Sequence, residues 1–240
     1  MTQWSLSGPV IALRSAVYGL SFVGLTALFS LLYPLILMPR QPVWAIVKLY
    51  AQIQLWLLRV ICGVQYRVEG MEHLPQGPCI LASRHESSWE TMFLPVAFDL
   101  PAVILKQEIL GYPIFGPLAR KFGFIGVDRS GSLENAKKTF EAARVATSEG
   151  RNVLIFPSGT RDPEHRFRVQ GGVSVMYRTL KLPCVPIVLN SGAVWPYKDW
   201  RRYPGVITVR ILPAIPPGLR GNEFMPRLTE ALQTPIAPEV

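Results

Sequence analysis

The chain opens on a long apolar stretch. Residues 15–39 are 25 consecutive positions without a charged side chain, more than the roughly 20 apolar residues with which a helix crosses a bilayer. A cleavable signal peptide would be shorter and would end at small residues, whereas Met38-Pro39-Arg40 follows here. A buried core helix is the other alternative, although few core helices run this far without a charge. We therefore predict a membrane helix.

A second apolar stretch covers residues 43–62. At about 100° per residue, four polar side chains in and just before this stretch share one narrow stripe of a helix: Gln41, Lys48, Gln52 and Arg59. A basic stripe beside tryptophans is typical of a helix at the level of the lipid headgroups. Pro39 and Pro42 break the chain between the two helices. We predict a membrane-associated helical hairpin over residues 1–62, and both a bilayer span and insertion into one leaflet stay open.

From Val64 onward, short β-branched runs alternate with amphipathic stretches. The runs predict strands over 79–82, 102–105, 122–127, 153–156, 185–189 and 206–212. The amphipathic stretches predict helices over 90–98, 133–149, 172–181 and 223–233. Several strands are apolar throughout, as strands covered on both faces are. Residues 63–240 are therefore predicted to form one α/β domain with a largely parallel sheet flanked by helices.

Composition narrows the function classes. With 49% hydrophobic and 17% charged residues the chain can bury a core, which excludes a disordered protein. The net charge of +9 suits nucleic acid or an anionic membrane. The apolar N-terminal region and the absence of a basic run favour the membrane. Three cysteines without paired spacing predict neither a disulfide framework nor a metal site, and they suit a reducing, cytosolic setting.

The first candidate for chemistry follows the strand predicted over 79–82. His85 and Glu90 are five residues apart, about 140° around a continuous helix, so they can meet only if His85 precedes the helix on a turn. The carboxylate would then fix the imidazole tautomer and leave the other ring nitrogen as a general base. The alternative is structural, because Ser87-x-x-Glu90 also matches a helix capping box.

Three cations follow three other predicted strands. Lys106 comes after the strand over 102–105, and Arg129 after the strand over 122–127. Arg161 ends the segment Phe156-Pro157-Ser158-Gly159-Thr160-Arg161, a turn that can expose backbone N–H groups. The carboxyl ends of parallel strands share one edge, so these cations would converge on a site for an anionic substrate. Arg84 is a further cation next to His85.

In this order the segments resemble the glycerolipid acyltransferases, specifically bacterial-type 1-acylglycerol-3-phosphate (lysophosphatidic acid) acyltransferases. The resemblance covers about residues 64–220 and includes the block from Lys106 to Gly116 and the strand Val185-Pro186-Ile187. The family motif His-x4-Asp stands here as His85-x4-Glu90, and Phe-Pro-Glu-Gly-Thr-Arg stands with Ser158 in place of Glu. The replacement of Glu by Ser158 removes a carboxylate beside the acceptor site.

The resemblance implies transfer of a fatty acyl group from acyl-CoA or acyl carrier protein to lysophosphatidic acid. His85 would be the general base and Glu90 its partner, while Lys106, Arg129 and Arg161 would bind the acceptor phosphate. The turn Ser158-Gly159-Thr160 would line the acceptor site, and no cofactor or metal is implied. The partners would be membrane lipids and the acyl donor, at the inner (cytoplasmic) membrane with the catalytic domain facing the cytosol.

Three alternatives remain open at this point. The acceptor could be another lyso-lipid, such as a lyso-amino-acid lipid. The chain could bind membrane lipids with little catalysis. A hydrolase would need Cys79 or Ser158 as nucleophile, although the Gly-x-Ser-x-Gly pattern is absent around Ser158.

Overall fold

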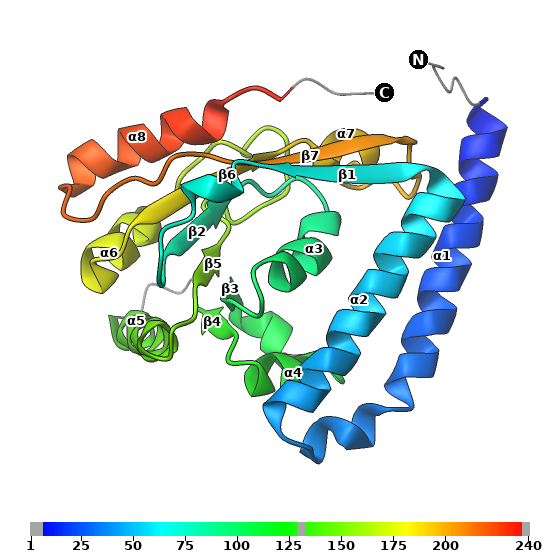
Figure 1. Cartoon of the computed structure of the whole chain (residues 1–240), viewed down its shortest axis with the longest axis horizontal. Helices are drawn as coiled ribbons and strands as arrows, with labels where there is room; N and C mark the ends of the chain where they lie inside the picture. The colour runs from blue at the N-terminus through cyan, green and yellow to red at the C-terminus, as the bar shows by residue number, and fades with distance from the viewer. Residues whose placement is uncertain (1–6, 129–132, 237–240) are drawn as a thin grey trace.

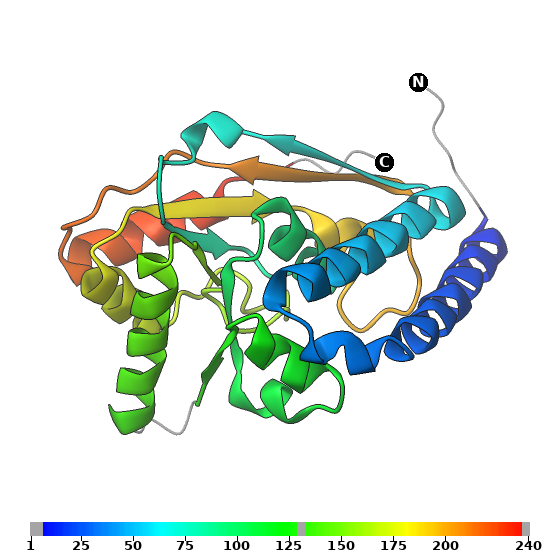
Figure 2. The ribbon, with the colours of Figure 1, turned by 60° about the horizontal axis from the view of Figure 1, so that its bottom comes forward.

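The structure is a computed structural model that describes residues 7–128 and 133–236. A twisted sheet lies at the centre, with helices on both faces and two long helices side by side at one end (Figures 1 and 2). These two helices are α1 (Gly8–Ser30) and α2 (Arg40–Cys62), joined by the 3₁₀ helix η1 (Tyr33–Leu37). The two predicted N-terminal helices are therefore present. Pro39 lies in the break between them as expected, whereas Pro42 lies in the first turn of α2.

The sheet has seven strands in the order β1-β7-β6-β2-β5-β3-β4. They are β1 (Val64–Glu69), β2 (Ile80–Ser83), β3 (Ala102–Lys106), β4 (Ile125–Val127), β5 (Val153–Ile155), β6 (Cys184–Leu189) and β7 (Gly205–Ile211). All neighbours pair in parallel except β6 and β7, so β7 and its partner β1 run opposite to the other five strands. This confirms the predicted α/β fold with a largely parallel sheet.

The helices that follow α2 are α3 (Trp89–Ala97), α4 (Phe115–Lys121), α5 (Leu133–Ser148), α6 (Gly171–Leu180), α7 (Ser191–Val194) and α8 (Gly221–Gln233). Two further 3₁₀ helices are η2 (Met71–His73) and η3 (Gln107–Gly111). The strand predicted over 122–127 is wrong in its first half, because only Ile125–Val127 pairs in the sheet. Phe122 is instead the C-cap of α4, and its ring packs edge-on against Trp44 with centroids 5.4 Å apart.

Alternate side chains along the strands supply two cores, one on each face of the sheet. On one face, β2, β6 and β7 pack with α2 and α3 through residues such as Leu81, Ile187, Leu58 and Phe93. On the other face, α5, α6 and α8 cover residues such as Ile80 and Val153. Because both faces are covered, the central strands read as continuous apolar runs.

The N-terminal helices are partly bound into this core. Both are long and apolar enough to cross a membrane, but only 11% of the apolar stretch of α1 and 28% of that of α2 is buried. So little burial argues against α1 as the core helix of a soluble protein. Tyr18 of α1 and Leu58 of α2 nevertheless lie in the same hydrophobic cluster as β6 and β7.

Two substitutions in α2 compare the stability contributed by its buried face with that contributed by its exposed face. Leu58 is 1% exposed and Trp56 is 59% exposed. Leu58→Ala should lower the free energy of unfolding by about 2–5 kcal/mol, because it leaves a cavity in the core. Trp56→Ala should change it by less than about 1 kcal/mol. Denaturant titration in detergent micelles measures both, and equal effects would mean that α2 is not part of the domain core.

Candidate active site

One edge of the sheet gathers the predicted site. The strands β6, β2, β5, β3 and β4 are neighbours and parallel, so their carboxyl ends lie along the same edge. His85 follows β2 by two residues, the segment 156–161 follows β5, and Lys106 is the exposed last residue of β3. Arg129 lies outside the described residues. The described candidates therefore belong to adjacent strand ends, as the parallel arrangement requires.

His85 and Glu90 are in direct contact. His85 lies on the turn before α3, and its Nδ1 is 3.0 Å from Oε1 of Glu90. The imidazole also stacks on the ring of Phe156, with centroids 4.2 Å apart. A carboxylate at Nδ1 accepts a hydrogen bond from the Nδ1–H group, which leaves the lone pair on Nε2, the atom that a general base uses.

Glu90 is fully buried and accepts hydrogen bonds at both oxygens. Besides His85, Oε1 accepts from the backbone N–H groups of Glu86 (2.6 Å) and Ser87 (2.7 Å). Oε2 accepts from the hydroxyls of Ser87 and Ser191, each at 2.7 Å. Burial, the largest influence, would raise the pKa of Glu90, but the hydrogen bond and charge of His85, together with the serine donors, hold that pKa below its usual value.

The capping-box alternative describes part of the same geometry. Glu90 does accept the backbone N–H of Ser87, and the Ser87 hydroxyl accepts the backbone N–H of Trp89. The carboxylate that organises the start of α3 is thus the one that contacts His85. The two readings of this motif are not exclusive.

The turn after β5 presents Arg161 toward the same region. Its Nη1 donates to the hydroxyl of Ser88, 2.5 Å away, and its guanidinium lies over the ring of Tyr197. Gly159 has φ +64°, a conformation that favours glycine. The hydroxyl of Ser158 donates to the carbonyl of Thr160 at 2.7 Å, so Ser158 is engaged within its own turn.

Arg84 has a different use from the other cations. It is 6% exposed, and its guanidinium donates to the backbone carbonyls of Leu232 and Thr234 at the end of α8. Burial lowers the pKa of Arg84, although the neighbouring Glu86 opposes this. The hydrogen bonds of Arg84 therefore hold the end of α8 beside the turn that carries His85.

Sequence reasoning missed Ser191 and Tyr197. Ser191 contacts Glu90 across 101 residues of chain, and Tyr197 reaches Arg161 from the segment between α7 and β7. The position of Ser191 in the sequence could have indicated its role, because Ser191 lies two residues beyond the predicted strand over 185–189 and therefore at the same sheet edge.

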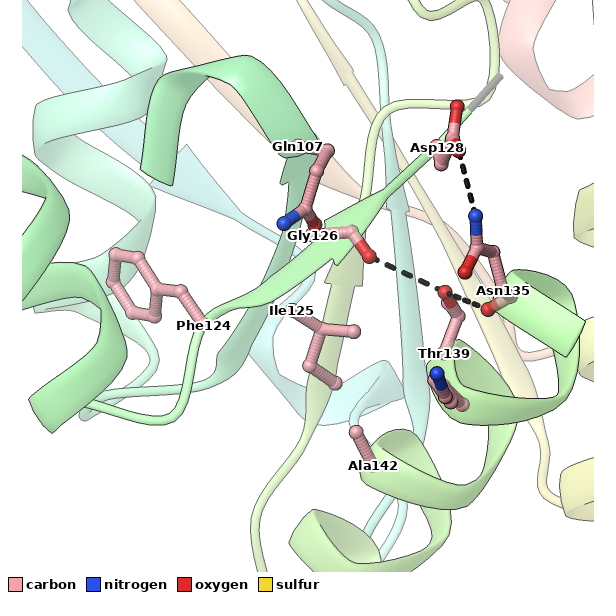
Figure 3. Close-up of a pocket in the computed structure, with 9 residues that line it drawn as sticks. Gln107, Phe124, Ile125, Gly126, Asp128, Asn135, Thr139 and Ala142 are labelled. Carbon is pink, nitrogen blue, oxygen red and sulfur yellow. Dashed lines mark hydrogen bonds between the residues drawn. The ribbon is translucent and has the colours of Figure 1, made fainter. Parts of the chain in front are cut away.

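A pocket of about 410 Å³ lies between β4, η3 and α5 (Figure 3). Its lining includes Gln107, Gly126 and Thr139, and the Thr139 hydroxyl donates to the carbonyl of Gly126 at 3.2 Å. Gln107 directly follows Lys106. The pocket thus borders the end of β3 but contains neither His85 nor Glu90.

The nucleophiles of the hydrolase alternative are poorly placed. Cys79 is 1% exposed, and burial raises the pKa of its thiol to about 12, so the reactive thiolate is not formed near neutral pH. Ser158 is held within its turn.

Asp162, Glu164 and His165 cluster closely enough to offer metal-ligand atoms, but on an ordinary turn in which Asp162 accepts the N–H of Glu164.

Comparison with known proteins identifies relatives. A family model described as acyltransferase matches residues 65–190. A 1-acyl-sn-glycerol-3-phosphate acyltransferase of Pseudomonas aeruginosa is 36% identical over 171 residues, which are 71% of this chain and 66% of the relative. A protein of the same name from Limnanthes douglasii is 30% identical over 172 residues, which are 70% of this chain and 60% of that protein. The aligned region thus spans slightly less than two thirds of both relatives.

The fold has a solved counterpart. The crystal structure of the 1-acyl-sn-glycerophosphate (LPA) acyltransferase PlsC from Thermotoga maritima superimposes with a TM-score of 0.69 at 19% identity, covering 95% of this chain and 99% of that one. The likeness includes the N-terminal helices, because it extends over nearly the whole chain. The family model matches more than half of the residues of this chain. The chain therefore belongs to the acyltransferase family.

Proposed function

We propose that the protein transfers a fatty acyl group from an acyl thioester to the free hydroxyl of lysophosphatidic acid, giving phosphatidic acid. The observation that carries this proposal is the contact between His85 Nδ1 and the buried carboxylate of Glu90. The names of the Pseudomonas and Limnanthes relatives support the acceptor. The donor is acyl-CoA or acyl carrier protein, and the reaction uses no metal or further cofactor.

The chemistry requires one proton to move twice. Nε2 of His85 takes the proton of the acceptor hydroxyl as the oxygen attacks the thioester carbonyl. Glu90 stabilises the imidazolium that forms, as the carboxylate of a serine-hydrolase triad does. The tetrahedral intermediate then expels the thiolate, which receives the proton from the imidazolium. The acyl group passes directly to the acceptor, without an acyl-enzyme.

Membrane association would supply both lipids to this site. The outer face of α1 carries exposed apolar side chains along its length, among them Leu13, Leu20 and Val23. Burying such side chains in lipid is favourable by about 25 cal/mol per Å² of apolar surface. We infer that α1 and α2 dock at the inner (cytoplasmic) membrane, with the catalytic domain on the cytosolic side.

One assay tests the function. Purified protein in vesicles is given labelled lysophosphatidate with acyl-CoA or acyl-acyl carrier protein, and products are separated by lipid chromatography. Labelled phosphatidate from at least one donor is expected. Parallel reactions use a zwitterionic lysophospholipid and a lyso-amino-acid lipid, since Ser158 replaces the acidic residue of the family motif. Transfer to one of these acceptors in preference to lysophosphatidate would contradict the proposed substrate.

The role of Arg161 in binding the acceptor phosphate has its own test. Arg161→Ala should raise the KM for lysophosphatidate about tenfold or more while changing the KM for the acyl donor little, because a guanidinium that pairs with phosphate touches only one substrate. Steady-state kinetics with each substrate varied in turn measures both constants. The exposed Arg178 on α6 provides the matched control, Arg178→Ala. Equal changes in both KM values would identify Arg161 as a structural residue.

A further inference from the structure

The first turn of α7 is joined to the His85–Glu90 loop by two adjacent residues. The hydroxyl of Ser191 donates to Oε2 of Glu90 at 2.7 Å. The next residue, Gly192, donates its backbone N–H to Oε2 of Glu86 at 3.2 Å. A Cβ on Gly192 would lie 3.1 Å from the same oxygen, so the two segments are in close contact.

Ser191 is fully buried, which limits what it can do. Without exposed surface, its side chain is not a surface for substrate. Its hydroxyl has the carboxylate of Glu90 and the Ser87 hydroxyl, 3.0 Å away, as its neighbours. The burial of a polar group at this position is compensated only while these hydrogen bonds are made.

We propose that Ser191 is a positioning residue for the acyl transfer, holding the Glu90 carboxylate in the orientation that aligns His85. This proposal rests on the proposed function of the His85–Glu90 pair. Glu90 can rotate about its terminal bond, and Oε1 alone contacts His85 and the two backbone donors. The serine hydroxyls fix Oε2, and with it the plane of the carboxylate. Ser87 lies only three residues before Glu90 in the same segment, whereas Ser191 connects the carboxylate to a distant part of the fold.

The segment that carries Ser191 is itself firmly held. Asn190 precedes it, and its side-chain oxygen accepts the backbone N–H of Thr208 in β7 at 2.8 Å. Trp195 follows α7, and its ring packs edge-on against Tyr18 of α1, with centroids 5.9 Å apart. Ser191 thus lies between a sheet strand and an N-terminal helix, on a support that does not depend on the His85 loop.

The test is a double-mutant cycle. Ser191→Ala should lower kcat roughly 10–100-fold, the effect of losing one hydrogen bond to a charged group, with both KM values within about threefold of wild type. In a Glu90→Gln background the same substitution should add less than about threefold, because the carboxylate that it positions is gone. Ser191→Cys, with a weaker donor of similar size, should fall between serine and alanine. Ser174→Ala, which truncates a buried serine on α6, should leave kcat unchanged.

A second measurement needs no turnover. The proton on His85 Nδ1, identified by its loss in His85→Ala, should give a downfield NMR resonance in the wild type that moves in Ser191→Ala and not in Ser174→Ala. An unmoved resonance with unchanged kcat would overturn the role of Ser191, as would an additive effect in the Glu90→Gln background. A wild type that does not acylate lysophosphatidate would contradict the proposed function instead, and the resonance would still decide the role of Ser191.

Discussion

Replacing His85 by alanine should abolish acyl transfer while leaving the fold intact. The side chain is 14% exposed on the turn before α3, where it stacks on Phe156 and contacts Glu90. Loss of a general base lowers the rate by about 10²–10⁴-fold. The initial rate of phosphatidate formation and the circular dichroism spectrum of His85→Ala measure the two parts of this prediction.

The control is another histidine that makes a hydrogen bond. Nδ1 of His73, in η2, lies 2.8 Å from the carbonyl of Ile211. η2 follows β1, which runs opposite to the strands that end at the candidate site. His73→Ala should cost some stability and leave the rate of the folded protein unchanged. If folded His85→Ala keeps more than a tenth of wild-type turnover, His85 is not the base.

The contact between His85 and Glu90 could be predicted because the alternatives are few. Two residues that are five positions apart lie on different faces of one helix. His85 and Glu90 can therefore meet only if His85 lies on the turn before the helix, and the structure has this arrangement. The grouping of His85, Lys106 and Arg161 at one sheet edge followed equally from parallel strands. Both inferences depend on general geometry, namely the pitch of an α-helix and the shared edge at which parallel strands end.

What could not be predicted depends on contacts between distant segments. From the sequence, Arg84 is one more cation beside the candidate site. In the structure its guanidinium donates to backbone carbonyls at the end of α8, a contact between segments about 150 residues apart. The apolar run at Phe122 looks like a strand, but Phe122 ends α4 and Gly123 has φ +67°, so the chain there is not extended. β1 was missed for another reason: it alternates apolar and polar residues, which is a strand pattern, but it lies at the sheet edge and contains no apolar run of the kind used to predict the other strands.

Glu90→Gln should reduce turnover nearly as much as His85→Ala, about 10²–10⁴-fold, without unfolding the protein. The amide oxygen can still accept from His85 and the backbone N–H groups of Glu86 and Ser87, while the amide nitrogen can donate to the hydroxyls of Ser87 and Ser191 if these rotate. The hydrogen bonds are therefore replaceable, but the charge that stabilises the imidazolium is not. The corresponding amide substitution in a serine protease triad lowers kcat about 10⁴-fold, because the imidazole there takes the wrong tautomer, and that effect would add to the loss of charge here.

Glu90→Asp is the matched comparison, because it keeps the charge and shortens the side chain by one methylene. The family motif carries Asp at this position, so the turn before α3 can be built around the shorter residue. Turnover within about tenfold of wild type is expected, with the loss arising from longer contacts to Ser191 and His85. The ratio of kcat between the Asp and Gln variants, measured at equal thermal stability, isolates the charge from the geometry. If Gln instead matches wild type, Glu90 serves only to cap α3, since an amide oxygen accepts the N–H groups of Glu86 and Ser87 equally well.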